Sequence, residues 1–474
     1  ADQERLIELM EGVEDIPGIA LSEGLSWDWE SFPDYLDAIE RRSHDIDIAA
    51  QLPHAALRVY VMGERAANLE IANSDEIAQM RQLTCEAVQA GALGFSSSRT
   101  LNHRTSKGDP TPSLKASEAE LFGIAEGLND AQAGVIEMIS DFPDFHQEFE
   151  TFRQMVQKSG RSMSISLAQS EQKPDGWRKI LGKIEAASNE GLTMKAQVAP
   201  RPIGLLLGLQ TTLCPFMGHP SYKEIASLPL AEKVRIMRDP AFREKLLSET
   251  RAEKYDRMKH ILDGHYKMYP LSDPPDYEPD PSTSIKAIAE REGRRPEEII
   301  YDLLLERDGE AMLYSTFANY ANFNLDATRE MLLHKDTLMG LGDGGAHVGT
   351  ISDGSFPTYL MTHWGRDRTR GERLELPWLV KRQTSDNARA VGLYDRGLLK
   401  VGMKADVNVI DYENLRVRAP EIVYDLPAGG RRLLQRADGY LATLVNGEVV
   451  YQNGEHTGAL PGKLIRGAQA APAV

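Results

Sequence analysis

Hydrophobic and polar positions in the N-terminal part of the chain follow two alternating patterns. Apolar residues recur at the spacing of an amphipathic helix over residues 29–39, 149–158 and 176–189. Between such stretches lie short apolar runs of the length typical of buried strands. Strands that alternate with helices at this spacing indicate parallel βαβ units, and the pattern predicts an α/β fold, a (β/α)8 barrel of the TIM type. The predicted strands cover residues 45–52, 91–96, 134–139, 162–167 and 192–198.

Residues 215–284 interrupt this alternation inside a barrel that is expected to extend over residues 1–395. Residues 215–268 are polar, rich in Met and Lys, and helical in pattern without strand-like runs. Residues 269–284 combine many prolines with acidic side chains, and proline at this density prevents regular structure. We therefore expect a helical, proline-rich insertion over the barrel mouth, as a lid or a contact between subunits. The strand–helix pattern resumes at Ile285.

The C-terminal part of the chain differs again. Residues 405–411 alternate between apolar and polar side chains, as a half-buried strand does. Residues 442–451 contain two short β-type runs joined at Asn446 and Gly447, a dipeptide that favours a two-residue hairpin turn. Residues 396–474 are therefore predicted to form a small β-sandwich domain.

The composition is that of a globular protein with an excess of acidic groups. Hydrophobic residues make up 41% and charged residues 26% of the 474 residues, which is enough apolar material for a large core. The formal net charge of -17 argues against nucleic acid or an anionic membrane as the main partner. No apolar run approaches the roughly 20 residues that span a bilayer, and no signal-like start is present, so a cytoplasmic location is expected. The expected partner is a small-molecule substrate, and assembly into a homo-oligomer stays open.

The leading candidate for chemistry is the segment 338–347. An apolar run ends in a cluster of glycines that contains Asp343, and His347 follows shortly after. In TIM-type barrels the catalytic groups lie where strands end and loops begin, and glycine lets the backbone turn sharply there. A carboxylate beside an imidazole suits acid–base catalysis, but Asp and Gly are also ordinary turn formers. Asp343 and His347 are thus the candidate catalytic residues, with a plain turn as the alternative.

Five further polar residues near predicted strand ends are candidates for binding a substrate. His54 follows the first predicted strand, and Arg99 lies in the loop after the next one. Gln169 and Gln197 lie near the ends of two later strands. Arg201 stands between two prolines that restrict its backbone, and a rigidly held arginine suits bidentate capture of a carboxylate. Each of the five could equally be a satisfied loop or surface residue.

Several blocks of the sequence resemble the amidohydrolase superfamily, and within it the D-aminoacylase-like branch of N-acyl-D-amino-acid deacylases. Residues 395–411 are similar to the closing signature of the family, a glycine-containing turn that leads into an Ala-Asp strand start. Residues 443–454 resemble its Val-Asn-Gly hairpin, and residues 56–63 and 86–96 resemble two earlier blocks. The segment around Asp343 corresponds to the last barrel strand of the family, so the resemblance covers nearly the whole chain.

The resemblance implies a metal-dependent hydrolase of a C–N (amide) bond, with deacylation of an N-acyl amino acid as the leading expectation. It implies a divalent metal, with zinc expected, that activates a water molecule. The residue at the position of Asp343 is linked to this metal, so Asp343 is expected to bind it and to transfer the proton, with His347 beside it. Two alternatives stay open: a hydrolase of a cyclic amide or ureido acid, and a non-catalytic relative that keeps the barrel for binding.

The sequence departs from the family pattern at its histidines. It contains no His-x-His pair, which the family carries on its first barrel strand, and its start resembles the region after the family's second strand. On the fifth and sixth strands, Ile139, Ser140 and Leu167 stand where the family has imidazole ligands. Zinc commonly takes three or four protein ligands, and this chain visibly supplies Asp343 and His347. We therefore expect an incomplete metal site within these residues, and an N-terminal segment that is omitted or separately encoded.

Overall fold

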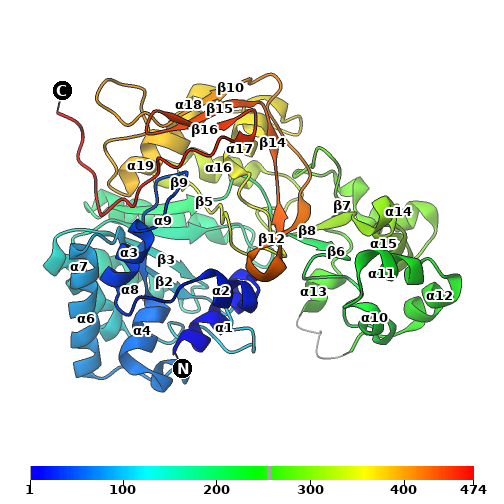
Figure 1. Ribbon diagram of the computed structural model, residues 1–474, viewed down its shortest axis with the longest axis horizontal. Coiled ribbons are helices and arrows are strands. Elements are labelled where there is room, and N and C mark those ends of the chain that lie inside the picture. Colours follow the sequence, from blue (N-terminus) through cyan, green and yellow to red (C-terminus); the bar gives the residue numbers. More distant parts are fainter. Residues whose placement is uncertain (1, 253–257, 474) are drawn as a thin grey trace.

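The computed structural model describes residues 2–252 and 258–473, and its central element is a parallel sheet (Figure 1). Six strands pair side by side in one direction. A TIM-type barrel is built from eight such strands; the described residues form six, with β1 and β9 at the two edges. The α/β barrel architecture predicted from the sequence is confirmed. In sheet order, the strands are β1 (Gln51–Pro53), β2 (Gly94–Arg99), β3 (Val135–Ser140), β4 (Met163–Leu167), β5 (Met194–Val198) and β9 (Thr337–Met339).

Helices pack around this sheet and against one another. Helices α6 and α7 approach each other closely, and a Cβ atom at Gly127 would lie 2.5 Å from the carbonyl oxygen of Arg81. Glycine at this position therefore lets the two helices touch through their backbones. The helices of this layer are α3 (Phe32–Glu40), α4 (His54–Met62), α5 (Glu64–Ala67), α6 (Ser74–Gln89), α7 (Glu118–Ala131), α8 (Phe145–Ser159), α9 (Gly176–Asn189) and α16 (Asp326–Leu333).

The two faces of the sheet carry different side chains, as the two-residue period of a strand requires. Phe95 and Ile136 are fully buried and belong to the main core that the helices share. On the opposite face, the strand register places Ser96 beside Glu137 and Glu137 beside Ser164. All three are half-buried. The face away from the helices is therefore polar near the middle of the sheet.

The first predicted strand is shorter in the structure than in the sequence pattern, because its beginning pairs with the C-terminal unit. Asp47 accepts hydrogen bonds from Lys404 Nζ at 2.6 Å and from Arg396 Nη1 at 2.9 Å. The backbone nitrogen of Ile48 donates to the carbonyl oxygen of Lys463 at 2.9 Å. Only the end of the predicted strand joins the parallel sheet as β1.

A second lobe lies between β5 and β9 in the chain and projects to one side of the molecule (Figure 1). Its antiparallel sheet has the order β6-β8-β7, and its separate core contains Phe216, Ile300 and Leu313. The sequence predicts an insertion over residues 215–284, whereas the lobe includes strands on both sides of that range. The expectation that the insertion lacks strands is wrong, because β7 lies where the proline-rich stretch begins and pairs with β8 far along the chain. The lobe contains β6 (Ile203–Gly208), α10 (Pro220–Ile225), α11 (Leu230–Met237), α12 (Pro240–Ser248), α13 (Lys259–Leu262), β7 (Met268–Pro270), the 3₁₀ turns η2 (Pro281–Thr283) and η3 (Glu306–Gly309), α14 (Ile285–Glu292), α15 (Pro296–Leu304) and β8 (Met312–Ala318).

The C-terminal residues form antiparallel strands, including a four-stranded sheet of order β10-β15-β16-β17. Asn446 and Gly447 join β15 to β16 with φ angles of 51° and 84°, the left-handed values that a two-residue hairpin turn requires. The antiparallel sheet and its predicted hairpin are confirmed. The elements are β10 (Val407–Ile410), β11 (Arg416–Val417), β12 (Glu421–Leu426), η6 (Pro427–Gly429), β13 (Gly430–Leu434), β14 (Ala437–Asp438), β15 (Tyr440–Val445), β16 (Glu448–Gln452) and β17 (Glu455–His456).

Short helices occupy the remaining parts of the chain, before β1 and between β9 and β10. Two of them are π-helical turns, a rare conformation that is found frequently near functional sites. None of the helices in the described ranges is both long and apolar enough to cross a membrane. These elements are α1 (Asp2–Glu14), α2 (Gly18–Gly24), α17 (Phe356–Tyr359), η4 (Leu360–Asp367), α18 (Leu376–Lys381), η5 (Arg382–Asp386) and α19 (Asn387–Ala390).

Candidate active site

The glycine-rich loop after β9 carries Asp343 and His347 at the carboxyl end of the parallel sheet. His347 Nε2 lies 3.3 Å from Asp343 Oδ2, so the structure brings the two predicted catalytic residues together. Gly345 and His347 have φ angles of 89° and 52°, and such values permit the tight turn between them. The Asp343 side chain is 56% exposed and that of His347 is 22% exposed. The carboxylate is therefore accessible, with the imidazole packed behind it.

Glu14, the last residue of α1, lies on the other side of His347. Its Oε2 atom is 3.8 Å from His347 Nδ1, and its carbonyl oxygen accepts a hydrogen bond from Val348 N at 3.1 Å. Burial opposes protonation of His347, but the hydrogen bond to Asp343 and the charge of Glu14 raise its pKa. Burial also raises the pKa of Glu14. Glu14 could not be recognised from the sequence, because nothing in its helix indicates a contact with a loop so far along the chain.

Asp353 is a second carboxylate near the candidate pair. It is buried, and its Oδ1 atom lies 3.3 Å from Arg201 Nη2. Burial raises the pKa of Asp353 to about 6, although the charge of Arg201 opposes the shift. The charges of Asp343 and His347 also act on this carboxyl group, which places it within electrostatic reach of both. Asp353 could not be recognised from the sequence, because a Ser-Asp-Gly segment looks like an ordinary turn.

Arg201 is predicted to capture a substrate carboxylate, and the structure places its guanidinium in the protein interior. The residue is 2% exposed, and its Nη2 atom donates to the carbonyl oxygen of Ser352. The ring centroids of Tyr277 and Phe356 lie 3.7 and 4.8 Å from the guanidinium carbon. Its contacts are with the segment after β9 and with the insertion lobe, and its role toward a substrate stays a prediction.

His54 lies on the helix-covered side of the sheet and is buried. Its Nδ1 atom is 2.7 Å from Ser97 Oγ, and its Nε2 atom is 2.8 Å from Glu120 Oε1. Burial lowers its pKa. Arg58 also donates to Glu120. Ser117 caps α7 through the backbone nitrogen of Glu120, but the Glu120 carboxylate turns toward His54 instead of the helix start.

Arg99 and Gln169 are also held by neighbouring protein groups. Arg99 donates to both carboxylate oxygens of Glu148, at 2.6 and 3.1 Å. Gln169 is buried, and its Oε1 atom accepts a hydrogen bond from the backbone nitrogen of Ala321 at 3.1 Å. The substrate-binding roles of His54, Arg99 and Gln169 stay predictions, and the structure shows a structural role for each.

Gln197 is a predicted binding residue that reaches the polar face of the sheet. Its Nε2 atom donates to Glu137 Oε1 and to Ser164 Oγ, both at 2.8 Å. A side chain at Gly340 would lie 3.5 Å from Gln197 Oε1, so the amide is next to the start of the Asp343 loop. These contacts join three strands into a polar surface next to the start of the loop that carries Asp343.

The residues present do not complete the metal site that the resemblance implies. Among the described residues, no three His, Cys, Asp or Glu side chains are grouped so that they could hold a metal ion. Ile139 and Leu167 lie at the ends of β3 and β4, and Ser140 donates to Glu148 Oε1 at 2.9 Å. The positions expected to carry imidazoles therefore offer no metal ligand of the kinds that zinc prefers.

Comparison with known proteins identifies the class to which this fold and site belong. The family model described as the amidohydrolase family matches residues 1–451, and the chain belongs to this family. Its match to this family and to D-aminoacylase and N-acyl-D-glutamate deacylase supports a hydrolase that acts on C–N amide bonds. An uncharacterised protein of Mycobacterium tuberculosis is 25% identical over 462 residues, covering 91% of this chain and 72% of the relative. The N-acyl-D-glutamate deacylase of Alcaligenes xylosoxydans xylosoxydans is 24% identical over 441 residues, covering 91% of this chain and 72% of the relative.

Solved structures of D-aminoacylase-like proteins share the fold of this chain. A crystal structure of D-aminoacylase superposes with a TM-score of 0.57 at 19% identity, covering 97% of this chain and 80% of that one. A second solved structure is N-acyl-D-glutamate deacylase from Bordetella bronchiseptica, in complex with zinc and a phosphonate inhibitor. It superposes with a TM-score of 0.53 at 19% identity, covering 94% of this chain and 78% of that one. The resemblance to the D-aminoacylase-like branch is confirmed. Metal centres are described for these relatives, including a binuclear one in D-aminoacylase.

Proposed function

We propose that this protein hydrolyses the amide bond of an N-acyl amino acid, releasing a carboxylic acid and the free amino acid. The observation that carries the proposal is the pairing of Asp343 with His347 at the carboxyl end of the last parallel strand. An accessible carboxylate held by an imidazole is suited to proton transfer. The names of two relatives, D-aminoacylase and N-acyl-D-glutamate deacylase, support the substrate class and favour the D configuration.

The proposed chemistry assigns one proton to Asp343. Its carboxylate accepts the proton of the attacking water, whose oxygen bonds to the amide carbonyl carbon. His347, held by Glu14 on its far side, keeps Asp343 oriented and brings positive charge toward the oxygen that becomes negative. When the C–N bond breaks, Asp343 returns the proton to the leaving nitrogen. Zinc is the proposed cofactor, but no step is assigned to it, because the described residues do not complete a site.

A panel of N-acetyl amino acids tests this proposal. The protein is incubated with D and L forms of N-acetylglutamate, N-acetylleucine and N-acetyllysine, with zinc added or with a chelator, and the free amine is quantified by chromatography. We expect amine release from at least one D substrate and less from its L form. Release of no amine from any substrate, with zinc present, would contradict the proposal.

A further inference from the structure

Arg201 and Asp353 form a buried ion pair beside the candidate active site. Arg201 Nη2 lies 3.3 Å from Asp353 Oδ1 and also donates to the carbonyl oxygen of Ser352. Both side chains are almost entirely removed from solvent, so salt screens their attraction little. Loss of either partner would leave an uncompensated charge in the interior, which is costly. The pair therefore fixes the loop after β5 to the segment after β9.

Two aromatic rings enclose the guanidinium. Tyr277, from the insertion lobe, lies 3.7 Å from its carbon, and Phe356, at the start of α17, lies 4.8 Å away. A cation over an aromatic face is attracted by the negative charge of the ring face, and burial strengthens the attraction. The guanidinium of Arg201 thus contacts two rings, a carbonyl oxygen and a carboxylate of the protein itself.

The segment that contains Asp353 packs directly against the turn that carries Asp343. A side chain at Gly342 would lie 3.3 Å from the carbonyl oxygen of Asp353 and 3.5 Å from the ring of Phe356. Backbones in such close contact move together, because a packed interior has little free space. A displacement of Asp353 would therefore displace Asp343.

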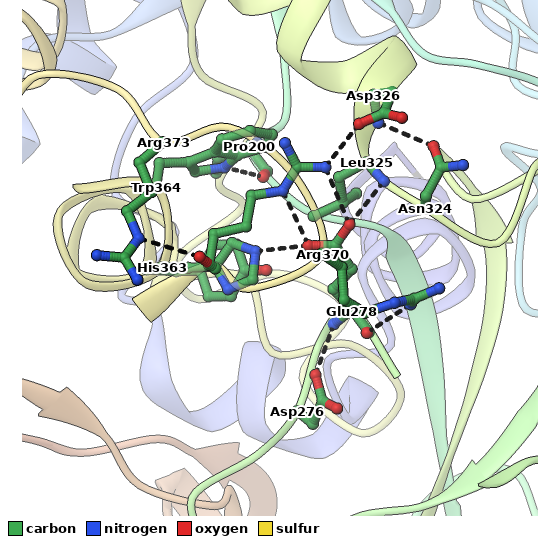
Figure 2. A network of polar contacts seen from close by, with 12 residues as sticks. Pro200, Asp276, Glu278, Asn324, Leu325, Asp326, His363, Trp364, Arg370 and Arg373 are labelled. Atoms are coloured by element: carbon green, nitrogen blue, oxygen red, sulfur yellow. Dashed lines mark hydrogen bonds and ion pairs between the residues drawn. The ribbon is translucent and has the colours of Figure 1, made fainter. Parts of the chain in front are cut away.

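The ring of Tyr277 is itself fixed by two other parts of the molecule. Gln435, in the C-terminal unit, donates from Nε2 to Tyr277 Oη at 2.8 Å. The next residue, Glu278, is buried and accepts a hydrogen bond from His363 at 2.9 Å (Figure 2). It also accepts one from Arg368 at 3.1 Å. The position of Arg201 therefore depends on contacts from three parts of the molecule: the lobe, the segment after β9 and the C-terminal unit.

We propose that Arg201 and Asp353 are positioning residues, whose ion pair holds the turn that carries Asp343, and that Arg201 does not contact the substrate. The proposal rests on the proposed function for its kinetic consequences. If Arg201 instead bound the carboxylate of the substrate, its loss would weaken substrate binding and raise KM. A positioning role predicts that loss of the ion pair lowers kcat and leaves KM nearly unchanged.

The kinetic experiment compares Arg201→Met, Arg201→Lys, Asp353→Asn and the double variant Arg201→Met/Asp353→Asn. Each is assayed on an N-acetyl-D-amino acid that the wild type cleaves and on the primary amide of the same compound. We expect kcat to fall by about 10²-fold with either substrate, because a displacement of about 1 Å has this effect on catalysis, while KM stays within a few-fold. The fall in kcat should be smaller for Arg201→Lys. The double variant should show no larger fall in kcat than a single variant, because both changes remove the same ion pair.

A second readout does not depend on turnover. Hydrogen–deuterium exchange of the free protein is followed for residues 340–354 in the wild type, Arg201→Met, Asp353→Asn and the control Arg396→Met. The control removes a less deeply buried ion pair, between Arg396 of the C-terminal unit and Asp47 in the segment before β1. Exchange in residues 340–354 should accelerate in the first two variants and stay unchanged in the control.

Three results would overturn the positioning role. A rise in KM for the free acid, with normal kinetics on the amide, would show that Arg201 binds the substrate carboxylate. Normal kcat with a lowered melting temperature would show a purely structural pair. Unchanged exchange over residues 340–354 would show that the pair does not hold the turn. If the wild type cleaves no N-acyl amino acid, the proposed function fails, and the exchange result still decides the positioning role.

Discussion

Glu14 Oε2 lies 3.8 Å from His347 Nδ1, so the end of the N-terminal helix α1 reaches the loop that carries Asp343. The backbone reinforces this contact, because Val348 N donates to the carbonyl oxygen of Glu14. The imidazole is thereby placed between two carboxylates, of which only Asp343 is mostly exposed. Helix α1 is therefore part of the candidate active site and not only part of the scaffold.

Substitution of Glu14 by Gln should impair catalysis without preventing folding. The amide keeps the size of the side chain but removes the charge that orients the His347 ring. We expect kcat to fall by about 10–100-fold, the range typical when the group that orients a functional histidine is lost. The control is Glu8→Gln, on the same helix, where the carboxylate pairs with exposed Lys107. Equal rates for Glu14→Gln and the wild type would remove Glu14 from the site.

Glu278 should make the stability of the protein depend on pH in the acid range. Burial alone would raise its pKa, but hydrogen bonds from His363 and Arg368 lower the pKa of Glu278 to about 2 (Figure 2). Because the folded pKa is depressed, the stabilisation is fully present above the unfolded pKa and is lost as the pH falls from about 4.5 toward 2. Glu278→Gln should therefore lower the free energy of unfolding by about 3 kcal/mol at pH 7.

Urea denaturation at pH 7, 5 and 3.5 checks this prediction. The difference between wild type and Glu278→Gln should be the same at pH 7 and 5 and smaller at pH 3.5. The exposed pair of Glu372 with Arg329 offers the control, and Glu372→Gln should change the free energy of unfolding by less than about 1 kcal/mol. The prediction would be contradicted if the difference in the free energy of unfolding between wild type and Glu278→Gln grew as the pH falls.

Glu120 should be important for stability, because it receives both His54 and Arg58 in the interior. Glu120→Gln leaves the buried Arg58 without a full countercharge. Breaking such a pair costs about 3–5 kcal/mol in the free energy of unfolding.

Two further variants provide the comparison. Ser117→Ala, which removes only the helix cap, should lower the free energy of unfolding by about 1 kcal/mol. Glu126→Gln, in a partly exposed pair with Arg81, serves as the control. Similar urea midpoints for Glu120→Gln and the control would refute the assignment.

The sequence predicts those features that depend on local patterns. It places the strands around Ile136 and Ile165 correctly, because short apolar runs between helical stretches are typical of buried strands. The hairpin at Asn446 is predictable because left-handed φ angles are cheap for Asn followed by Gly. Asp343 and His347 can be paired from the sequence because they lie in one short loop.

Contacts between distant segments could not be predicted in the same way. The antiparallel pairing of β6 with β8 makes Leu206 a strand residue of the lobe, although no strand is expected there from the sequence. Glu14 and Asp353 acquire their roles only when separate segments fold together. His54 and Arg201 illustrate a further limit, because position near a strand end does not tell which face a side chain joins. Burial decides this, and it is a property of the whole fold.

The most direct test of the account is the rate of amine release by Asp343→Asn, compared with the wild type on the N-acyl amino acid that it cleaves fastest. The amide keeps the shape of the side chain but cannot accept the proton of water. Asp308→Asn, in the exposed pair with Arg238 on the insertion lobe, is the matched control. With circular dichroism unchanged, the account predicts a loss of about 10²–10⁴-fold for Asp343→Asn and none for the control. A rate for Asp343→Asn within a few-fold of the wild type would contradict it.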